Sequence, residues 1–176
     1  MKTTTRSNIY LPMAALILTA AALAVPTAAQ TQVPSQVPPF DGTFQGNDTL
    51  SREKPEANCP TTVCTTGTGT GTLLGQFSFT EELTINFANL TNTGSAHWKA
   101  ANGDIIDTTV FGLAVPGPDV FTIAEIHIIT GGTGRFAGAQ GSFCVFRKHI
   151  VAFSPDGTHV TFGSFEGTIT SPGAAH

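Results

Sequence analysis

The pattern of apolar and polar positions is clearest over residues 121–146, FTIAEIHIITGGTGRFAGAQGSFCVF. Two runs rich in β-branched and aromatic side chains flank a glycine-rich turn at 131–138. Such runs around a glycine turn predict two antiparallel strands, at 120–130 and 141–153. In a nucleotide-binding loop the glycines would begin a helix, whose N-terminus binds phosphate. Here a strand follows them, so the sequence excludes that kind of site.

The remainder of the chain has the pattern of further strands, and no segment has a helical period with caps. These strands are expected at 40–46, 73–87, 95–100, 105–115 and 160–170. The stretch 73–87 contains two apolar runs around Glu81-Glu82, so it is either one long bent strand or a hairpin. Residues 47–66 have no periodicity and are expected to form the longest loop, while Asn102-Gly103 predicts a type I′ hairpin turn.

Short local turns between about seven or eight strands are typical of an up-and-down barrel or a sandwich. Two features favour closure. The strand at 120–129 is apolar on both faces, whereas an open sheet that faces water would alternate cleanly. Phe40-x-Gly-x-Phe-x-Gly46 is also echoed by Phe162-Gly-Ser-Phe-Glu-Gly167, and recurrent glycines permit the coiling that closure needs. We therefore expect an all-β, eight-stranded antiparallel up-and-down barrel over residues 40–170.

The N-terminal segment has the layout of a secretory signal peptide. Lys2 and Arg6 precede an apolar stretch at 9–25, and small residues precede a cleavage point after Ala29. The apolar stretch is shorter than the ~20 residues that a membrane anchor needs. We expect a signal peptide at 1–29, a flexible Pro-rich leader at 30–39, a disordered tail at 171–176 and secretion to the periplasm or the exterior.

Charge excludes two classes of partner. Without Lys2 and Arg6, the mature chain keeps 6 basic residues against 12 acidic ones. A protein this acidic lacks the positively charged surface that binds nucleic acid or an anionic membrane. Charged residues make up only 11% of the chain, while Phe occurs 13 times, which indicates that much surface is covered, inside the domain or by other subunits.

Three cysteines suit an exported protein that forms disulfides. Cys59 and Cys64 can close a small loop, and a bridge between Cys64 and Cys144 is the alternative. A zinc site is not expected, because neither a second cysteine pair nor a spaced histidine pair accompanies them.

Glu125 and His127 lie on one face of the expected strand at 120–130, among apolar neighbours. Inside a pocket this pair can act as acid and base, since burial raises the pKa of a glutamate. The other interpretation is that this face looks outward and both side chains are solvated at a subunit rim.

Arg147 and His149 are placed by the turn at 154–157. If 154 pairs with 158, Arg147 lies opposite Phe165 and His149 opposite Gly163, both pointing inward. An inward Arg147 either binds a carboxylate or enolate oxygen or extends to water at the barrel mouth. In the hairpin 120–153, residues near 121–123 are expected to face His149, and His127 is expected to face residues 143–145. This separates His127 from His149 by more than ~15 Å, so a metal ion shared by these two is not expected.

Trp98 and His149 are the candidate ligand contacts. Trp98 is the only tryptophan of the chain, and it either stacks on a ligand at the barrel mouth or packs in the core.

The segment Ile129-Thr-Gly-Gly-Thr-Gly-Arg-Phe-Ala-Gly-Ala-Gln-Gly141 resembles the glycine-rich signature of allene oxide cyclases and dirigent proteins. It resembles still more closely small exported bacterial proteins of the same barrel type, whose function is generally unassigned. The resemblance implies an eight-stranded barrel, often trimeric, that guides cyclisation or radical coupling of a small hydrophobic molecule without a cofactor. The polar residues on which those activities rest cannot be matched to positions of this chain.

Two hypotheses of function follow. The first is a cofactor-free cyclase or isomerase acting on a small hydrophobic molecule, with Glu125, His127 or Arg147 as catalytic groups. The second is a non-enzymatic extracellular protein that binds a small ligand or has a structural role. An apolar cavity of several hundred Å³ with converging polar groups would favour ligand chemistry. A barrel filled by phenylalanine side chains would oppose it.

Overall fold

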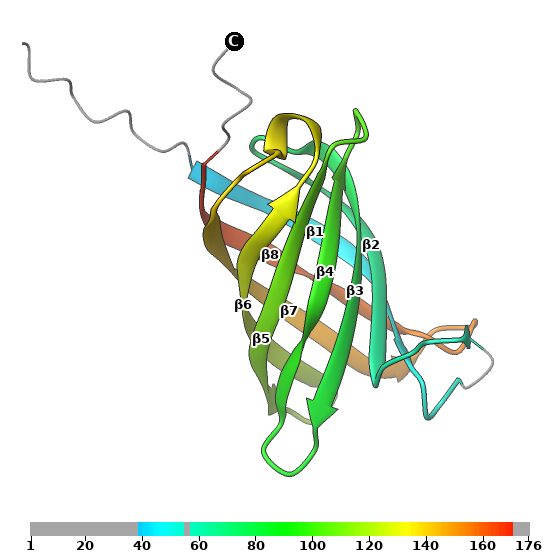
Figure 1. Ribbon diagram of the computed structural model, residues 1–176. Helices are drawn as coiled ribbons and strands as arrows, with labels where there is room; N and C mark the ends of the chain where they lie inside the picture. Colours follow the sequence, from blue (N-terminus) through cyan, green and yellow to red (C-terminus); the bar gives the residue numbers. More distant parts are fainter. Residues whose placement is uncertain (1–38, 55–56, 171–176) are drawn as a thin grey trace, which may run out of the picture. The chain divides into compact units, whose positions relative to one another are not determined.

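The computed structural model describes residues 39–54 and 57–170, which form a closed eight-stranded antiparallel barrel (Figure 1). The expected fold class is confirmed. The expected signal peptide, almost all of the leader and the C-terminal tail lie outside the described residues. The strands are β1 (Pro39–Leu50), β2 (Val63–Gly71), β3 (Gly75–Asn86), β4 (Thr91–Ala100), β5 (Ile105–Pro116), β6 (Val120–Gly132), β7 (Gly141–Phe153) and β8 (His159–Ile169).

Each strand pairs with the next one along the chain, and β1 closes the barrel against β8 from Pro39 to Asp48. Figure 1 shows β1 beside β8. The two ends of the barrel carry different loops. We call the end with the 133–140 turn the glycine-turn end, and the end with the 51–62 loop the disulfide end. A 3-10 helix, Gly134–Phe136, lies in the glycine turn.

Side chains alternate between the barrel interior and its surface, as the period of a strand requires. The Thr-Gly stretch at 66–71 forms most of β2, with its glycines at the inward positions and its threonines at the outward ones. A Cβ atom at Gly67 would lie 2.4 Å from the Phe79 ring. The β2 backbone thus packs directly on aromatic rings, which only glycine permits.

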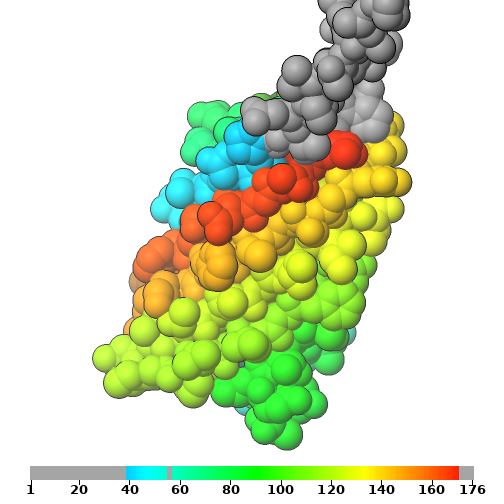
Figure 2. Space-filling model, turned by 90° about the vertical axis from the view of Figure 1, so that its left-hand side faces the viewer, coloured from blue at the N-terminus to red at the C-terminus, as the bar shows by residue number. Residues whose placement is uncertain are grey.

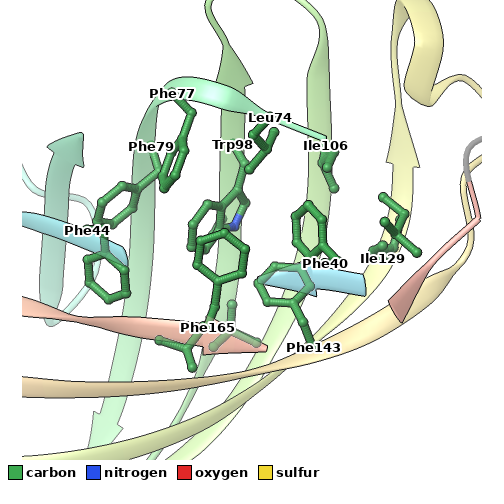
Figure 3. Packing of buried hydrophobic residues seen from close by; sticks show 14 of the residues in the cluster. Phe40, Phe44, Leu74, Phe77, Phe79, Trp98, Ile106, Ile129, Phe143 and Phe165 are labelled. Atoms are coloured by element: carbon green, nitrogen blue, oxygen red, sulfur yellow. The ribbon is translucent and has the colours of Figure 1, made fainter. Parts of the chain in front are cut away.

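Aromatic side chains fill the half of the barrel nearer the glycine-turn end (Figure 3). Trp98 stacks on Phe79 with ring centroids 5.1 Å apart, and Phe40 contacts Phe143 edge-on at 5.0 Å. We call this group the aromatic plug: Phe40, Phe44, Phe77, Phe79, Trp98, Phe143 and Phe165, all at most 6% exposed. Burying one such side chain contributes roughly 1.5–3 kcal/mol, so the plug is a main source of stability.

Three local predictions need correction. The loop expected at 47–66 is shorter, because β1 runs to Leu50 and β2 begins at Val63. The stretch 73–87 forms one strand, β3, rather than a hairpin. Asn102 has no positive φ; only Gly103 does, at 92°, and its N–H donates to Ala100 O, so this turn is not type I′. It is a three-residue loop with glycine in the left-handed position.

The β7–β8 register also differs from the expected one. Phe153 pairs with His159, as the predicted turn requires, but an irregularity between His149 and Phe153 then shifts the pairing by two residues. Arg147 therefore lies opposite Gly163 and His149 opposite Thr161, instead of Phe165 and Gly163. A shift of two keeps every side chain on its face, so both residues point inward as expected.

Cys59 and Cys64 form a disulfide within the 51–62 loop and the start of β2. Cys144 is free and exposed on β7, so the alternative bridge from Cys64 to Cys144 is wrong. Over the described residues, no helix is both long and apolar enough to cross a membrane.

Candidate functional site

Arg147 lies in the barrel interior among three buried carboxylates. Its Nη1 lies 3.1 Å from Asp48 Oδ1, its Nη2 3.3 Å from Glu81 Oε2, and its Nε 3.0 Å from Glu125 Oε2. All four residues are at most 4% exposed. We call them the ionic cluster. A buried charge is tolerated only when it is paired and hydrogen-bonded, which explains why these groups converge.

Strand alternation brings the cluster together from four strands. Asp48 follows the inward Phe40 and Phe44 on β1, and Glu81 follows the inward Phe77 and Phe79 on β3. Glu125 on β6 and Arg147 on β7 occupy inward positions in the same way.

Glu125 accepts three side-chain hydrogen bonds. Arg147 binds both its oxygens, with Nε on Oε2 and Nη2 on Oε1, each at 3.0 Å. Asn92 Nδ2 donates a third bond to Oε1 at 2.9 Å. This bidentate geometry is the strongest arrangement for a guanidinium and a carboxylate. It fixes Arg147 in place.

Asp48 joins the ionic cluster to His149. His149 Nδ1 lies 2.6 Å from Asp48 Oδ2, and the Thr65 hydroxyl donates to Oδ1 at 2.7 Å. Burial acts to raise the pKa of Asp48, but the charge of Arg147 and the bonds from His149 and Thr65 outweigh it, so the pKa is lowered. An ionised Asp48 holds the proton of His149 on Nδ1, which leaves Nε2 as the basic nitrogen.

Glu81 and His127 form a second pair on the side of the cluster nearer the aromatic plug. Burial, and then the charge of Glu125, raise the pKa of Glu81 well above its usual value despite Arg147. Burial, with a contribution from Arg147, lowers the pKa of His127 to about 3. At neutral pH the imidazole is therefore uncharged.

The tautomer of His127 follows from its neighbours. The Thr108 hydroxyl donates its one proton to Ala96 O and so accepts from His127 Nδ1, 3.1 Å away. The proton of the ring is thus on Nδ1, and Nε2 carries a lone pair. Nε2 lies 3.5 Å from Glu81 Oε1 and has no hydrogen-bond partner within the described part of the chain.

A cavity of about 170 Å³ lies between the ionic cluster and the disulfide end of the barrel. Asp48, Asn92, Arg147 and His149 give it one polar wall. The other lining residues are mainly apolar: Leu50, Val63, Leu83, Ile85, Phe87, Leu90, Ala114, Phe121 and Ile123, with Arg52 from the 51–62 loop. An engineered cavity of about 150 Å³ binds benzene, so this one has room for a molecule of that size.

Residues of two loops flank the mouth of the cavity. The Arg52 guanidinium lies over the Phe87 ring, 4.8 Å from its centroid, and both residues line the cavity. Arg52 belongs to the loop that the Cys59–Cys64 disulfide ties to β2.

The structure brings the three predicted catalytic residues, Glu125, His127 and Arg147, into one buried cluster. They point into the barrel, not outward at a subunit rim. His149 lines the cavity. Trp98, the other predicted ligand contact, is 1% exposed in the aromatic plug and does not line the cavity.

Sequence reasoning missed Asp48, Glu81 and Asn92. Asp48 lies in the segment 47–66 that is expected to be a loop, although the alternation of Phe40, Phe44 and Asp48 places all three on one face. In the sequence Glu81 separates two apolar runs, although it continues the inward series of β3.

No protein-family model, curated protein or solved structure matches this chain.

Proposed function

We propose that the protein binds one small, largely apolar molecule in the cavity at the disulfide end of the barrel. The observation that carries the proposal is the composition of the cavity wall. Apolar side chains from several strands surround a space of about 170 Å³, and His149 and Asp48 lie on one side. Ligand sites have this character, with a mostly apolar lining and a few oriented polar groups. The aromatic plug restricts the ligand to this end, and the volume restricts it to roughly the size of a substituted benzene.

The position of His149 specifies the polar group of the ligand. Its Nδ1 is engaged by Asp48, so Nε2 is the nitrogen that offers an acceptor. A ligand with one hydroxyl group can donate to it. One such hydrogen bond contributes about 0.5–1.5 kcal/mol, so phenol is expected to bind about 2- to 13-fold more tightly than benzene.

Phenol binding to the mature protein, measured by calorimetry in the presence of EDTA, tests the proposal. We expect saturable binding with a Kd on the order of 1 mM or tighter. Ala114→Phe would fill the cavity and abolish binding, whereas Leu113→Phe, on the outer face of the same strand, would leave it unchanged. Absence of binding, or equal binding by the Ala114→Phe variant, would refute the proposal.

A cofactor-free cyclase or isomerase is the second candidate, and the Asp48–His149 pair favours it. A histidine whose Nδ1 is bound by a carboxylate is an effective general base. His149 Nε2 would remove a proton from the bound molecule and return it elsewhere, and confinement in the cavity would supply proximity. The resemblance of residues 129–141 to allene oxide cyclases and dirigent proteins supports this form of the proposal.

Proton exchange tests this activity without a known substrate. Incubation of cyclohexanone with the protein in deuterated water, followed by NMR, would show faster loss of its α-protons if His149 acts as a base. The His149→Leu variant should lose the acceleration. Equal rates with wild-type protein, variant and buffer would leave only the binding function.

We also propose that the chain is exported and that copies of it associate. The Cys59–Cys64 disulfide is compatible with an oxidising compartment. Self-association is supported by the apolar outer face of β5 to β8. Figure 2 shows these four strands as adjacent bands. This face carries large side chains that are 41–49% exposed: Phe111, Leu113, Ile126, Ile128, Phe146 and Phe162.

Phe111 lies opposite Ile126, and Leu113 and Phe146 lie opposite Ala124 on its two sides, so these side chains form one patch across β5, β6 and β7. Contiguous apolar patches of this kind mark interaction surfaces. Light scattering of the mature protein should therefore give a mass above that of one chain. Ile126→Lys should reduce it, while Thr68→Lys, on the polar outer face of β2, should not. A monomeric wild-type protein would refute self-association.

A further inference from the structure

His127 has an unusual property for so deeply buried a side chain. It is 1% exposed, and its Nε2 has no hydrogen-bond partner among the residues described. Leaving a buried polar atom unpaired costs about 1–3 kcal/mol. The aromatic ring of Phe143 stacks on the imidazole at 4.9 Å, so the ring cannot readily turn to find a partner.

The orientation of this imidazole is the one that metal-binding histidines adopt. A histidine that coordinates through Nε2 donates its Nδ1 proton to a neighbouring acceptor, which fixes the tautomer and the ring. Here Nδ1 donates to the Thr108 hydroxyl, which in turn donates to a main-chain oxygen. The lone pair of Nε2 is thereby directed away from the β5 side, toward Glu81.

Two carboxylates complete a set of three potential ligands. Single oxygen atoms of Glu81 and Glu125 and a ring nitrogen of His127 all lie within 4.8 Å of one another. Nε2 of His127 is 3.5 Å from Glu81 Oε1. Ligand atoms around a tetrahedral ion with bonds of about 2.0–2.1 Å are ~3.3 Å apart. This pair is close to that spacing, and side-chain movements of up to about 1.5 Å would complete the set.

The charge balance of the ionic cluster points the same way. Asp48, Glu81 and Glu125 face only one guanidinium, that of Arg147. When Glu81 gives up its proton, as metal coordination requires, and the histidines are counted as neutral, two negative charges remain uncompensated, which is the charge of one divalent cation. Arg147 binds Glu81 through Oε2, so Oε1 on the His127 side is left for another partner.

We propose that Glu81, Glu125 and His127 form a binding site for one divalent transition-metal ion, Zn²⁺ by its ligand chemistry. Imidazole suits Zn²⁺ better than Mg²⁺ or Ca²⁺, which prefer sites made of oxygen alone. The sequence argued against a zinc site because it showed no histidine pair. The fold instead joins one histidine to two carboxylates from other strands. This site goes beyond the small-molecule function and does not depend on it.

Metal content after refolding tests the proposal. Because the site is buried, the mature protein would be unfolded in urea with its disulfide intact and refolded with Zn²⁺ or with EDTA. Gel filtration would remove free metal, and mass spectrometry would count zinc per chain. We expect about one zinc per chain, and a rise in Tm of about 5–10 °C at a 100-fold excess over Kd.

Matched variants separate this site from adventitious binding. Glu81→Gln and His127→Gln preserve side-chain size and should reduce bound zinc to below about a tenth of an ion per chain. His97→Gln is the control, because His97 and Asp107 form an exposed pair on the outer surface, 2.6 Å apart. It should bind zinc as the wild type does. A wild type without zinc, variants that keep it, or a His97→Gln variant that loses it would each overturn the proposal.

A measurement on the wild type alone covers the case in which a variant does not fold. The nitrogen NMR spectrum of the imidazoles should show a zinc-induced shift at Nε2 of His127, which keeps its proton on Nδ1, and no such shift at His149. Shifts at an exposed histidine instead would contradict the assignment. The zinc experiment contains no phenol and the phenol experiment contains EDTA, so failure of one proposal is distinguishable from failure of the other.

Discussion

Replacement of Glu81 by glutamine is the most informative perturbation of the ionic cluster. Burial and the nearby Glu125 raise the pKa of Glu81, so the folded protein binds this proton more tightly than the unfolded chain does. Glutamine has the shape of the protonated acid but cannot ionise. Glu81→Gln should therefore change how stability depends on pH, with little effect on the structure.

The magnitude follows from proton linkage in metal-free protein. An acid whose pKa is raised in the folded state makes its full contribution to stability below its pKa in the unfolded chain, 4.5 for Glu81. As the pH rises above 4.5, the free energy of unfolding falls by about 1.4 kcal/mol per pH unit for this one proton. His127 acts in the opposite direction. Its pKa is about 3 when folded and 6.5 when unfolded, so stability falls as pH drops through this interval, by about 5 kcal/mol in all.

Above pH 4.5 the two effects oppose each other, because the proton on Glu81 favours the folded state while the protonation of His127 favours the unfolded one. The free energy of unfolding of the wild type should therefore rise less steeply with pH between 4.5 and 6.5 than that of Glu81→Gln. In Glu81→Gln only His127 remains, so stability should rise toward pH 6.5 by about 1.4 kcal/mol per unit and then stay level.

Urea unfolding in EDTA at half-unit steps from about pH 4 to 8 would measure both profiles. Glu82→Gln is the matched control, because Glu82 is the next residue along β3 and points outward. It should follow the wild type. Parallel profiles for wild type and Glu81→Gln would refute the reasoning that Glu81 binds its proton more tightly in the folded state.

Two further perturbations test the fold around the site. Arg147→Met leaves buried carboxylates without their cation. In urea titrations at pH 7 it should therefore lower the free energy of unfolding by about 3–5 kcal/mol. A loss below about 1 kcal/mol would contradict the role of Arg147. Replacing Cys59 and Cys64 together by serine should cost about 2 kcal/mol, as expected for so short a loop, while far-UV circular dichroism stays unchanged. Cys144→Ser, at the exposed free thiol, should change neither measurement, and global unfolding of the double variant would show that the loop supports the barrel.

The fold could be predicted from the sequence because strands of this length show a clear two-residue alternation of inward and outward side chains. Around the central hairpin, the expected pairing of Phe121 with His149 and of His127 with Phe143 is confirmed. The predicted β7–β8 pairing differs from the observed one by two residues. The reason is an irregularity of the strand between His149 and Phe153, which no residue pattern in the sequence indicates. The inward direction of Arg147 survived that error, since a shift of two residues preserves the face.

The site could be predicted only in part. Glu125, His127 and Arg147 were found because each is a polar residue on an otherwise apolar face. Asp48 and Glu81 could not be recognised in the same way, because each lies beside other polar residues, so the alternation of inward and outward positions is not evident around them. That four strands bring these carboxylates to one guanidinium is a consequence of the closed register, which a single sequence does not specify.

A crystal structure of the mature protein soaked with phenol tests the central claim most directly. The account predicts the phenol ring among apolar side chains such as Leu83 and Ile123, with its hydroxyl group at hydrogen-bond distance from His149 Nε2. A barrel end closed by its own side chains, or phenol bound only on the outer surface, would contradict it.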